Sequence, residues 1–498
     1  MSSEALILSI DQGTTNTKAI LVDASGSILH RASRPVLPTF PRPGWVEHDP
    51  LLIWTSVRRA VRDCLDAAGD PGLVGVALTN QRESVMMWDR STGEPVGPLI
   101  VWQCRRSSSI CRELRRQGAE DVIRRRSGLP IDPLFSASKL RWLVDHIPDG
   151  RRRAEDGALC AGTVDSWLLW NLTDGSVHAT DPGNASRTQL FNLEMMSWDE
   201  ELLSMFDIPA PLLPRVAASN SVFGETAGRN DVPSGVPIAA VLGDSHAALL
   251  GHGGVHPGVV KATYGTGTSL MSPISDLIIP LNGLGVTVAW QLDGCTRYAL
   301  EGNISATGAA IDWCTELFGL TDAAETAALA NSVRSNEGVY VVPAFVGLGA
   351  PHWNDDARGL ITGITRGTTS AHVARAVVES VAYQVRDVFD AIEESSRTES
   401  VELLTDGGAS RNSSLMQFQA DILGRVVKRN NAEDLSALGA AYAAGLALGV
   451  WADTDELAGL ARTFDRFEPS CTAVERDERY SGWRQAVART MFRPELST

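Results

Sequence analysis

One short sequence pattern constrains the fold more than any other, because it occurs twice. Near the start of the chain, apolar runs at 6–10 and 19–22 flank a polar turn rich in Thr and Asn with one Gly. The same order of apolar run, Gly/Thr-rich turn and apolar run returns at 258–271. Each pattern is typical of a β-hairpin. Two such hairpins half a chain apart predict a chain built from two related halves.

The turn of the first hairpin suits the binding of phosphate groups. Gly13 lets the backbone come close to a bulky anion, and threonine hydroxyls and backbone N–H groups can cradle phosphate oxygens. Asp11, at the end of the first predicted strand, is placed to hold a hydrated Mg²⁺ that carries the phosphates. An ordinary polar turn would explain either hairpin alone, but not the recurrence.

A third glycine turn lies within 403–412, after another apolar run. Gly407 and Gly408 leave room there for the base and ribose of a nucleotide. Two phosphate-type hairpins and an adenosine-type turn resemble the arrangement of the sugar kinase/actin-type ATPase fold. We therefore expect an α/β protein of two ribonuclease H-like domains, at 1–250 and 251–498, with a cleft between them.

Hydrophobic periodicity predicts several of the elements around these turns. Helices are expected at 50–68 and 371–395, and a short buried strand at 73–78. The residues at 149–156 are expected to form a charged loop. The Ala/Gly-rich stretch 437–449 suits a helix that packs closely against a sheet.

Composition excludes several classes of partner. The 498 residues carry a formal net charge of −16, which argues against nucleic acids and anionic membranes. Seven cysteines without a C-x-x-C pair predict neither a disulfide framework nor a zinc ribbon. No apolar run approaches the ~20 residues that span a bilayer, and a core strand is predicted almost at once, which leaves no room for a signal peptide. We expect a cytoplasmic protein.

Several further stretches carry a resemblance to a known family. They lie in family order over most of the chain, at 11–15, 43–50, 79–83, 100–106, 162–167, 184–187, 341–351 and 415–421. The stretch 359–364, followed by His372 and Glu379, fits the C-terminal signature of the same family. The chain resembles the FGGY family of carbohydrate kinases and, within it, the glycerol kinases. The resemblance implies a kinase that uses ATP and Mg²⁺, acts on a small polyol or sugar and forms a homo-oligomer, a dimer or tetramer.

Asp244 is the candidate general base. It ends a buried apolar run at 236–243, and phosphoryl transfer to an alcohol needs a carboxylate that accepts the hydroxyl proton. The residues alone leave open that Asp244 merely caps a helix. Its setting in 242–246 matches the catalytic Asp of the family.

The remaining site residues come from the resemblance. Taken alone, Arg82 and Glu83 could form a surface salt bridge and Trp102 could be a core residue, although donors and acceptors side by side also suit a polyhydroxyl ligand. By resemblance, the polyol site comprises Arg82, Glu83, Trp102, Leu134, Asp244, Ser245 and Ser269. The nucleotide site by resemblance comprises Thr14, Thr15, Asn16, Lys18, Thr266, Gly308, Asp312, Gly408 and Asn412, with Asp11 as the metal ligand.

Three of these positions depart from the glycerol kinase pattern. Leu134 stands where that pattern has Tyr, Ser245 where it has Gln, and Ser269 where it has an aromatic residue. All three replacements are smaller, so the pocket should be wider and should bind glycerol loosely. We therefore expect a polyol of four or five carbons or a related ketose as the substrate.

Other departures affect the nucleotide and regulation. Lys18 replaces an Arg of many glycerol kinases, and Asp312 replaces a Gln, so the contact of Asp312 with the nucleotide is uncertain. The segment 228–233 lacks the Gly-rich pattern that binds fructose 1,6-bisphosphate in some glycerol kinases.

Two alternatives stand beside the polyol kinase. A xylulose- or ribulose-type ketose kinase of the same fold is the nearest, although residues 80–83 favour the glycerol type. A non-catalytic ATP-binding regulator or actin-like assembly protein is the other. Such a protein would need no base at the cleft, so the presence of Asp11 and Asp244 argues against it.

Overall fold

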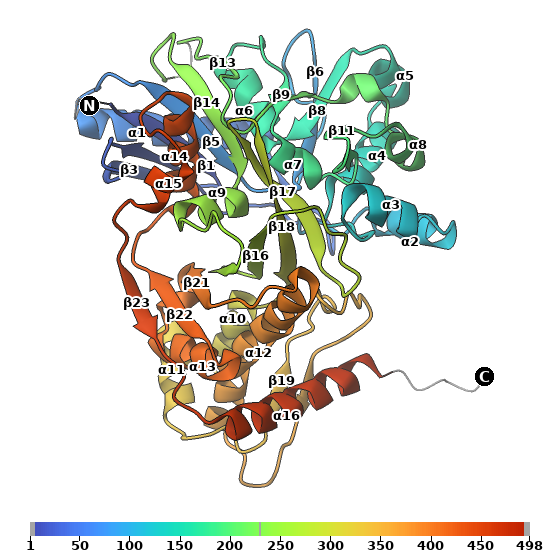
Figure 1. The fold of residues 1–498 in the computed structure, drawn as a ribbon. Helices are drawn as coiled ribbons and strands as arrows, with labels where there is room; N and C mark the ends of the chain where they lie inside the picture. Colours follow the sequence, from blue (N-terminus) through green and yellow to red (C-terminus); the bar gives the residue numbers. More distant parts are fainter. Residues whose placement is uncertain (1–4, 229–230, 493–498) are drawn as a thin grey trace.

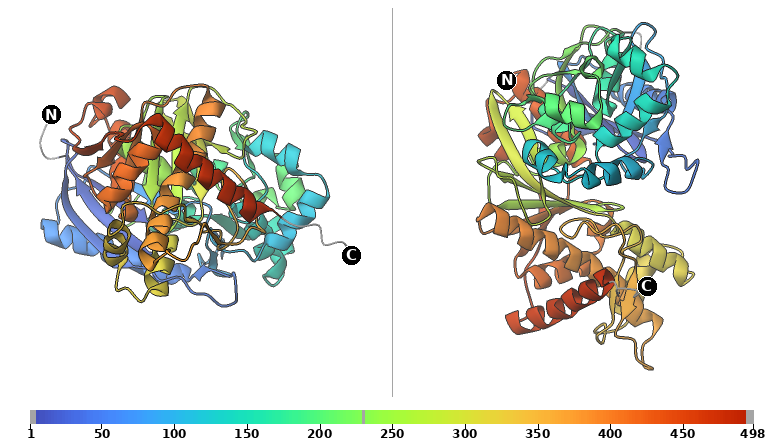
Figure 2. Two further views of the ribbon diagram at one scale, coloured as in Figure 1. Left: turned by 90° about the horizontal axis from the view of Figure 1, so that it is seen from below. Right: turned by 90° about the vertical axis from the view of Figure 1, so that its right-hand side faces the viewer.

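The chain folds into two α/β lobes, one above the other in Figure 1 and in the side view of Figure 2. The computed structural model describes residues 5–228 and 231–492. Residues 229 and 230, within the segment expected to lack the Gly-rich pattern, lie outside the described residues. The upper lobe contains most of the first half of the chain, and the lower lobe most of the second.

The first half is organised around a sheet of order β13-β14-β5-β1-β2-β3. Its strands are β1 (Ile7–Gln12), β2 (Asn16–Val22), β3 (Ile28–Pro35), β5 (Gly75–Asn80), β13 (Gly224–Glu225) and β14 (Pro237–Gly243). The predicted hairpin is the antiparallel pair β1–β2, while β5 runs parallel to both β1 and β14.

The second half repeats this plan in a sheet of order β17-β18-β16-β15-β21-β22-β23. Its strands are β15 (Val259–Tyr264), β16 (Thr268–Ile274), β17 (Gly285–Leu292), β18 (Cys295–Ile304), β21 (Glu402–Asp406), β22 (Val426–Asn430) and β23 (Phe464–Phe467). The second hairpin is β15–β16, and β21 runs parallel to both β15 and β22. The order β18-β16-β15-β21-β22 thus matches β3-β2-β1-β5-β14, which confirms the predicted repeat.

The rest of the first half covers its sheet and builds a second layer. A four-stranded sheet of order β4-β7-β6-β8 consists of β4 (Glu47–His48), β7 (Leu99–Ile100), β6 (Val85–Asp89) and β8 (Leu159–Thr163). The helices are α1 (Pro50–Ala68), α2 (Ser108–Arg116), α3 (Glu120–Ser127), α4 (Ser136–His146), α5 (Gly150–Glu155), α6 (Val164–Leu172), α7 (Pro182–Ser186), α8 (Glu200–Phe206), η1 (Ala210–Leu212) and α9 (Asp244–Gly251). The short strands are β9 (Ala179–Thr180), β10 (Phe191–Asn192), β11 (Ser197–Trp198) and β12 (Arg215–Val216).

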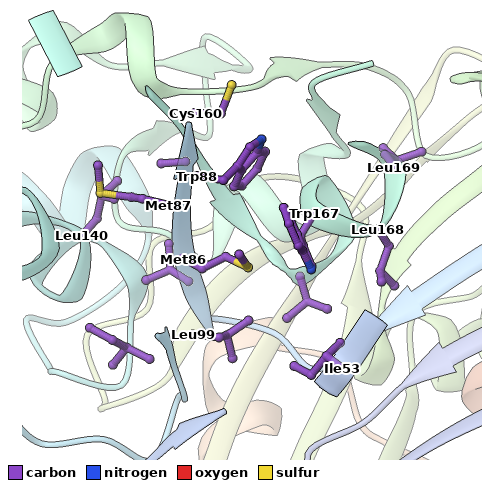
Figure 3. Packing of buried hydrophobic residues seen from close by; sticks show 14 of the residues in the cluster. Ile53, Met86, Met87, Trp88, Leu99, Leu140, Cys160, Trp167, Leu168 and Leu169 are labelled. Carbon is purple, nitrogen blue, oxygen red and sulfur yellow. The ribbon is translucent and has the colours of Figure 1, made fainter. Parts of the chain in front are cut away.

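The core of this layer is rich in Trp and Met. Trp88 on β6 and Trp167 on α6 lie side by side in Figure 3, with ring centroids 5.4 Å apart. The predicted charged loop at 149–156 was wrong, because most of it forms α5. This single turn packs on α4 and buries Ala154, a tertiary contact that its charged sequence does not show.

The helices of the second half are led by a long helix close to the predicted one at 371–395. They are α10 (Gly308–Leu317), α11 (Ala323–Asn331), α12 (Ser370–Ser396), η2 (Gly408–Arg411), α13 (Ser413–Leu423), α14 (Leu435–Ala447), α15 (Thr454–Ala458) and α16 (Ala473–Met491), with the strands β19 (Tyr340–Val342) and β20 (Leu360–Thr362). Among the described helices, none is both long and apolar enough to cross a membrane.

Helix α14 confirms the predicted close packing, but it packs on the first sheet rather than the second. It contacts β1, β5, β14 and α9, in the upper lobe of Figure 1. The sheet is therefore covered by α1 on one face and by α9 and α14 on the other. The domain boundary at 250/251 stays a prediction, since a helix from beyond it completes the first lobe.

Gly439 sets the distance between α14 and α9. A Cβ atom at Gly439 would lie 1.7 Å from the backbone oxygen of Ala247, which no rotamer change can relieve. We expect Gly439→Ala to lower the free energy of unfolding by about 2 kcal/mol, because the strain of overpacking exceeds the ~1 kcal/mol that Ala gains over Gly in a helix. Urea unfolding measures this. The control is Gly72→Ala, at an exposed site where an added Cβ atom would meet nothing within 4 Å, and it should change the free energy of unfolding little. An equally small effect of Gly439→Ala would contradict the packing argument.

Candidate active site between the two halves

The first sheet brings the catalytic candidates to one edge. Gln12, Asn80 and Gly243 are neighbours in the register of the parallel strands β1, β5 and β14. Because the carboxyl ends of parallel strands share an edge, the residues next to these positions gather there. Asp11 comes from β1, and Asp244 begins α9 directly after β14.

A buried group of charges at this edge joins the two halves. We call Arg82, Glu83, Arg187, Asp244, Ser269 and Glu301 the Glu301 network. Arg82 donates from Nη1 and Nη2 to Oε2 and Oε1 of Glu301, at 2.9 and 2.7 Å, and from Nε to Oδ1 of Asp244 at 3.2 Å. Glu301 lies on β18 of the second sheet, and its side chain is fully buried.

Two further donors complete the network. Arg187 lies 2.8 Å from Oε2 of Glu301 through Nη1, and its Nε donates to Oε1 of Glu83 at 2.6 Å. The hydroxyl of Ser269 donates to Oε1 of Glu301 at 3.0 Å. Charge-assisted bonds of this kind are short and strong, so Glu301 holds two guanidinium groups of the first half in place.

The pKa values of Glu301 and Asp244 are shifted in opposite directions. Burial raises the pKa of Glu301, but Arg187 and Arg82 together bring it well below its ordinary value. Burial also raises the pKa of Asp244, and Arg82 offsets only part of this, so the pKa of Asp244 lies above its ordinary value. A carboxylate with a raised pKa accepts a proton more readily, as a general base must.

The other predicted polyol residues lie around the network. The Trp102 indole donates to the hydroxyl of Thr14 at 2.9 Å. The backbone N–H of Leu134 donates to Asp132 at 2.8 Å, and the next residue, Phe135, lies under the guanidinium of Arg187 at 5.1 Å.

Two of the three departures from the glycerol kinase pattern flank the catalytic candidates. Ser245 follows Asp244, and its backbone N–H donates to Oδ1 of that carboxylate at 2.6 Å. The hydroxyl of Ser269 is bonded to Glu301, so this residue does more than leave space.

The nucleotide candidates are only partly brought together. A cleft of about 760 Å³ is lined by Asp11, Lys18 and Gly408, together with Thr263 and Asp406. This volume suits a small-molecule site. Gly407 belongs to the same lining, and its φ of +91° and a Cβ position 2.4 Å from the oxygen of Tyr264 both require glycine.

Lys18 is engaged within the protein. Its ammonium forms a salt bridge of 2.7 Å with Asp434, at the start of α14. Burial lowers the pKa of Lys18, but the charges of Asp11 and Asp434 outweigh it and raise the pKa above its ordinary value. The predicted phosphate-facing cation therefore stays charged and lines the cleft.

The remaining nucleotide candidates lie outside the residues that line this cleft. Gly308 donates to the oxygen of Gly265 at 3.0 Å, so α10 abuts the second hairpin turn that contains Thr266. The Asn412 side chain caps α13, and Asp312 is exposed on α10. Thr15 and Asn16 bond to each other through their side chains at 3.2 Å.

Asp11 has the properties of a metal ligand. Its Oδ1 atom is buried and has no hydrogen-bond partner among the described residues. Burial raises the pKa of Asp11 to about 7, and the charge of Lys18 offsets part of the effect. A carboxylate oxygen without a partner fits a hydrated divalent cation, the kind of ligand that Mg²⁺ takes in phosphate sites.

Sequence reasoning missed four residues of this region as site residues. Two of them, Arg187 and Glu301, belong to the Glu301 network. The other two are His252 and Asp406, which are in contact through Nε2 and Oδ2 at 2.6 Å. The available signal for Arg187 was its place in the family stretch 184–187. Glu301 lies within β18, and its full burial requires partners of opposite charge, which Arg82 and Arg187 supply.

The comparisons with known proteins agree with this geometry. The model of the FGGY family of carbohydrate kinases, N-terminal domain, matches residues 6–251, and that of the C-terminal domain matches residues 260–448. The chain belongs to the FGGY family of carbohydrate kinases. This confirms the predicted family, its kinase activity and its two-domain α/β fold.

Particular relatives in the family are similar over nearly the whole chain. Glycerol kinase 2 of Thermotoga maritima is 47% identical over 97% of this chain and 98% of its own length. The glycerol kinase of Symbiobacterium thermophilum is 48% identical over 98% of both chains. The crystal structure of Plasmodium falciparum glycerol kinase with ADP superposes with a TM-score of 0.92, at 32% identity, over 99% of this chain and 100% of that one.

The Glu301 network should dominate the local stability of this kinase. Replacing Glu301 by Gln leaves two buried guanidinium groups without a full negative partner, so we expect the free energy of unfolding to fall by about 3 kcal/mol. Because the pKa of Glu301 is lowered on folding, its stabilisation is present above about pH 4.5 and is lost as the pH falls further. Urea unfolding between pH 3 and 8 measures both effects, because the loss begins near pH 4.5 and continues to lower pH.

A matched control separates the network from an ordinary ion pair. Glu402→Gln removes a partner of Lys428, where both side chains are partly exposed, and should cost less than about 1 kcal/mol. Equal costs for the two variants, or no dependence of the Glu301→Gln effect on pH, would contradict the role given to Glu301.

Proposed function

We propose that this chain transfers the γ-phosphoryl group of ATP to a hydroxyl of a polyol, with Asp244 as the general base. The observation that supports this best is the position of Asp244. Its carboxylate is about one-third exposed, contacts Arg82 at 3.2 Å, and lies at the sheet edge that also holds Asp11. The two relatives at 47 and 48% identity carry the name glycerol kinase, which also favours a polyol as the acceptor.

The acceptor side of the site has the groups that this reaction needs. Arg82 and Glu83 offer donors and an acceptor to neighbouring hydroxyls of the substrate, and Arg187 and Glu301 hold them in place. Asp244 accepts the proton of the reacting hydroxyl of the substrate. At the same time, the oxygen of that hydroxyl bonds to the γ-phosphorus, and the bond between the γ-phosphorus and the β-phosphate oxygen breaks. The products are the phosphorylated polyol, ADP and a proton that leaves through Asp244.

The nucleotide side supplies positive charge and close backbone approach. Lys18 and the turn at Gly407 and Gly408 line the cleft, and Asp11 would hold the Mg²⁺. When bound, this ion neutralises phosphate charge and aligns the phosphates. Closure of the two halves over the substrates would exclude water, which is the competing acceptor.

The residue types at three positions of the proposed acceptor site favour a substrate longer than glycerol. Leu134, Ser245 and Ser269 are each smaller than the residues of the glycerol kinase pattern, so a polyol of four or five carbons or a ketose would fill space that glycerol leaves empty. Glycerol is the second candidate, because relatives at 46 to 48% identity carry the name glycerol kinase.

The homo-oligomer and the cytoplasmic location stay predictions.

A coupled ADP-release assay tests the reaction and the base together. Purified protein with Mg²⁺ and ATP is offered glycerol, erythritol, threitol, pentitols, xylulose and ribulose, and at least one should be phosphorylated. Asp244→Asn should lower kcat by about 10²–10⁴ because the base is lost, while ADP binding is retained. The exposed control Asp276→Asn should match the wild type. Wild-type protein that releases no ADP with any acceptor would rule the function out.

The specificity positions are tested by restoring the glycerol kinase residues. We expect the wild type to have its highest kcat/KM on a polyol or ketose larger than glycerol. The triple variant Leu134→Tyr, Ser245→Gln and Ser269→Phe should shift the kcat/KM ratio toward glycerol by about 10- to 100-fold, since lost space and a new amide favour the shorter substrate. If the wild type already prefers glycerol, these positions do not widen the pocket.

A further inference from the structure

Lys261 is a buried lysine that the proposed reaction does not yet use. It lies on β15 with its side chain fully buried, and its Nζ has no hydrogen-bond partner among the described residues. The other lysines all have partners: Lys18 pairs with Asp434, Lys139 donates to the oxygen of Leu134, and Lys428 pairs with Glu402. An unpaired ammonium in the interior is costly, so its position calls for a physical reason.

The alternation of β15 places Lys261 on the face toward the first half. Val260, Ala262 and Tyr264 belong to the core of the second half, and the Tyr264 hydroxyl donates to Gln419 on α13 at 2.8 Å. Because neighbouring residues of a strand point to opposite faces, Lys261 and Thr263 point the other way. Thr263 lines the cleft, as expected for that face.

The register of the second sheet shows which residues share this face. Lys261 pairs with Met271, which pairs with Glu301 on the next strand. Thr263 pairs with Asp406 on one side and Ser269 on the other. Lys261 therefore lies in the same row as Glu301 and next to the row that holds Asp406.

Helix α9 of the first half packs on this same face. Met271 clusters with apolar residues of α9, and His252, which follows α9, contacts Asp406 at 2.6 Å. Asp244 is the first residue of that helix. Lys261 thus lies in the seam between the second sheet and α9, with Asp244 toward the polyol side and Asp406 toward the nucleotide turn.

The charges around Lys261 agree with this position. Burial lowers the pKa of Lys261, Arg82 lowers it further, and Asp406, Asp244 and Glu301 oppose the shift. In return, Lys261 lowers the pKa of Asp244 and of Asp406. The groups that act on Asp244 include Arg82, Glu83, the backbone N–H of Ser245 and Lys261, and Asp244 acts on Asp11. On α9, Lys261 also acts on the buried His246.

Of the carboxylates near Lys261, Asp244 is the one on which the lysine charge should have the largest effect. Glu301 already has two arginines and Ser269, and Asp406 has His252. In contrast, the hydrogen bonds to Asp244 from Arg82 Nε and from the backbone N–H of Ser245 both fall on Oδ1. A positive charge that makes no hydrogen bond to Asp244 would favour the ionised carboxylate. It would also leave free the carboxylate oxygen that must take the proton.

We propose that Lys261 is a positioning residue for the phosphoryl transfer: its ammonium, buried in the seam between α9 and the second sheet, balances Asp244 and Asp406 and couples the acceptor side to the nucleotide side. The inference rests on the proposed role of Asp244 as the base. It assigns no contact between Lys261 and either substrate.

The variant Lys261→Met tests the inference, because it keeps the length of the side chain and removes the charge. Asp244 would then be protonated more easily, so the acid limb of the kcat/KM–pH profile should move up by about 0.5–1 pH unit. At pH values on the acid limb itself, the rate should fall by roughly 3- to 10-fold. The thermal midpoint should stay equal to or rise above that of the wild type, because a buried unpaired charge is replaced by an apolar group.

The control is Lys428→Met, which removes a partly exposed lysine of the same sheet that pairs with Glu402 and should leave the acid limb in place. An unshifted acid limb in a folded Lys261→Met protein overturns the inference, and so does a variant that fails to fold, since Lys261 would then be a structural cation. These outcomes differ from a failure of the proposed function, in which the wild type phosphorylates no acceptor or Asp244→Asn keeps full activity.

Discussion

The pairing of Glu301 with Arg82 and Arg187 is the interaction on which the site depends. Both arginines come from the first half and Glu301 from the second, so the bonds of 2.7 to 2.9 Å form only when the two lobes are assembled. None of these side chains could be buried alone, because an uncompensated interior charge is strongly unfavourable. Asp244 and Glu83 are held by the same arginines, so the proposed acceptor site forms at the interface between the lobes.

The repeated sheet explains how two lobes make one site. In each half, a hairpin strand runs parallel to the following central strand, so that the turn of the hairpin and the ends of the parallel strands lie at one edge. The first edge carries Asp11 and Asp244, and the second carries Asp406 and the turn at Gly407. The two edges face each other across α9, which packs on both sheets, and α14 returns from the second half to cover the first sheet.

Ser269 shows that a smaller residue in a pocket can add an interaction as well as space. Its hydroxyl donates to Oε1 of Glu301, the oxygen that also accepts from Arg82. A Phe side chain has no donor and could not make this bond. The departure from the glycerol kinase pattern therefore changes both the room beside the substrate and the support of the arginine that would bind it. If Ser269 lines the acceptor site as proposed, substrate preference and the rigidity of Arg82 are linked at this position.

Local patterns in the sequence determined both hairpins, helix α1, most of α12, and the membership of the FGGY family, because hairpin turns and helical periodicity depend on neighbouring residues. They also pointed to Arg82, Glu83 and Asp244 as candidates. Only the tertiary structure decided that Glu301 and Arg187 hold these residues, that α5 is a helix and that α14 covers the first sheet. It also showed that Lys261 is buried with no hydrogen-bond partner in the part of the chain that the structure describes. Helix α5 depends on its packing against the neighbouring α4. The other features join segments far apart in the chain, so they depend on burial and charge pairing that no short stretch of sequence contains.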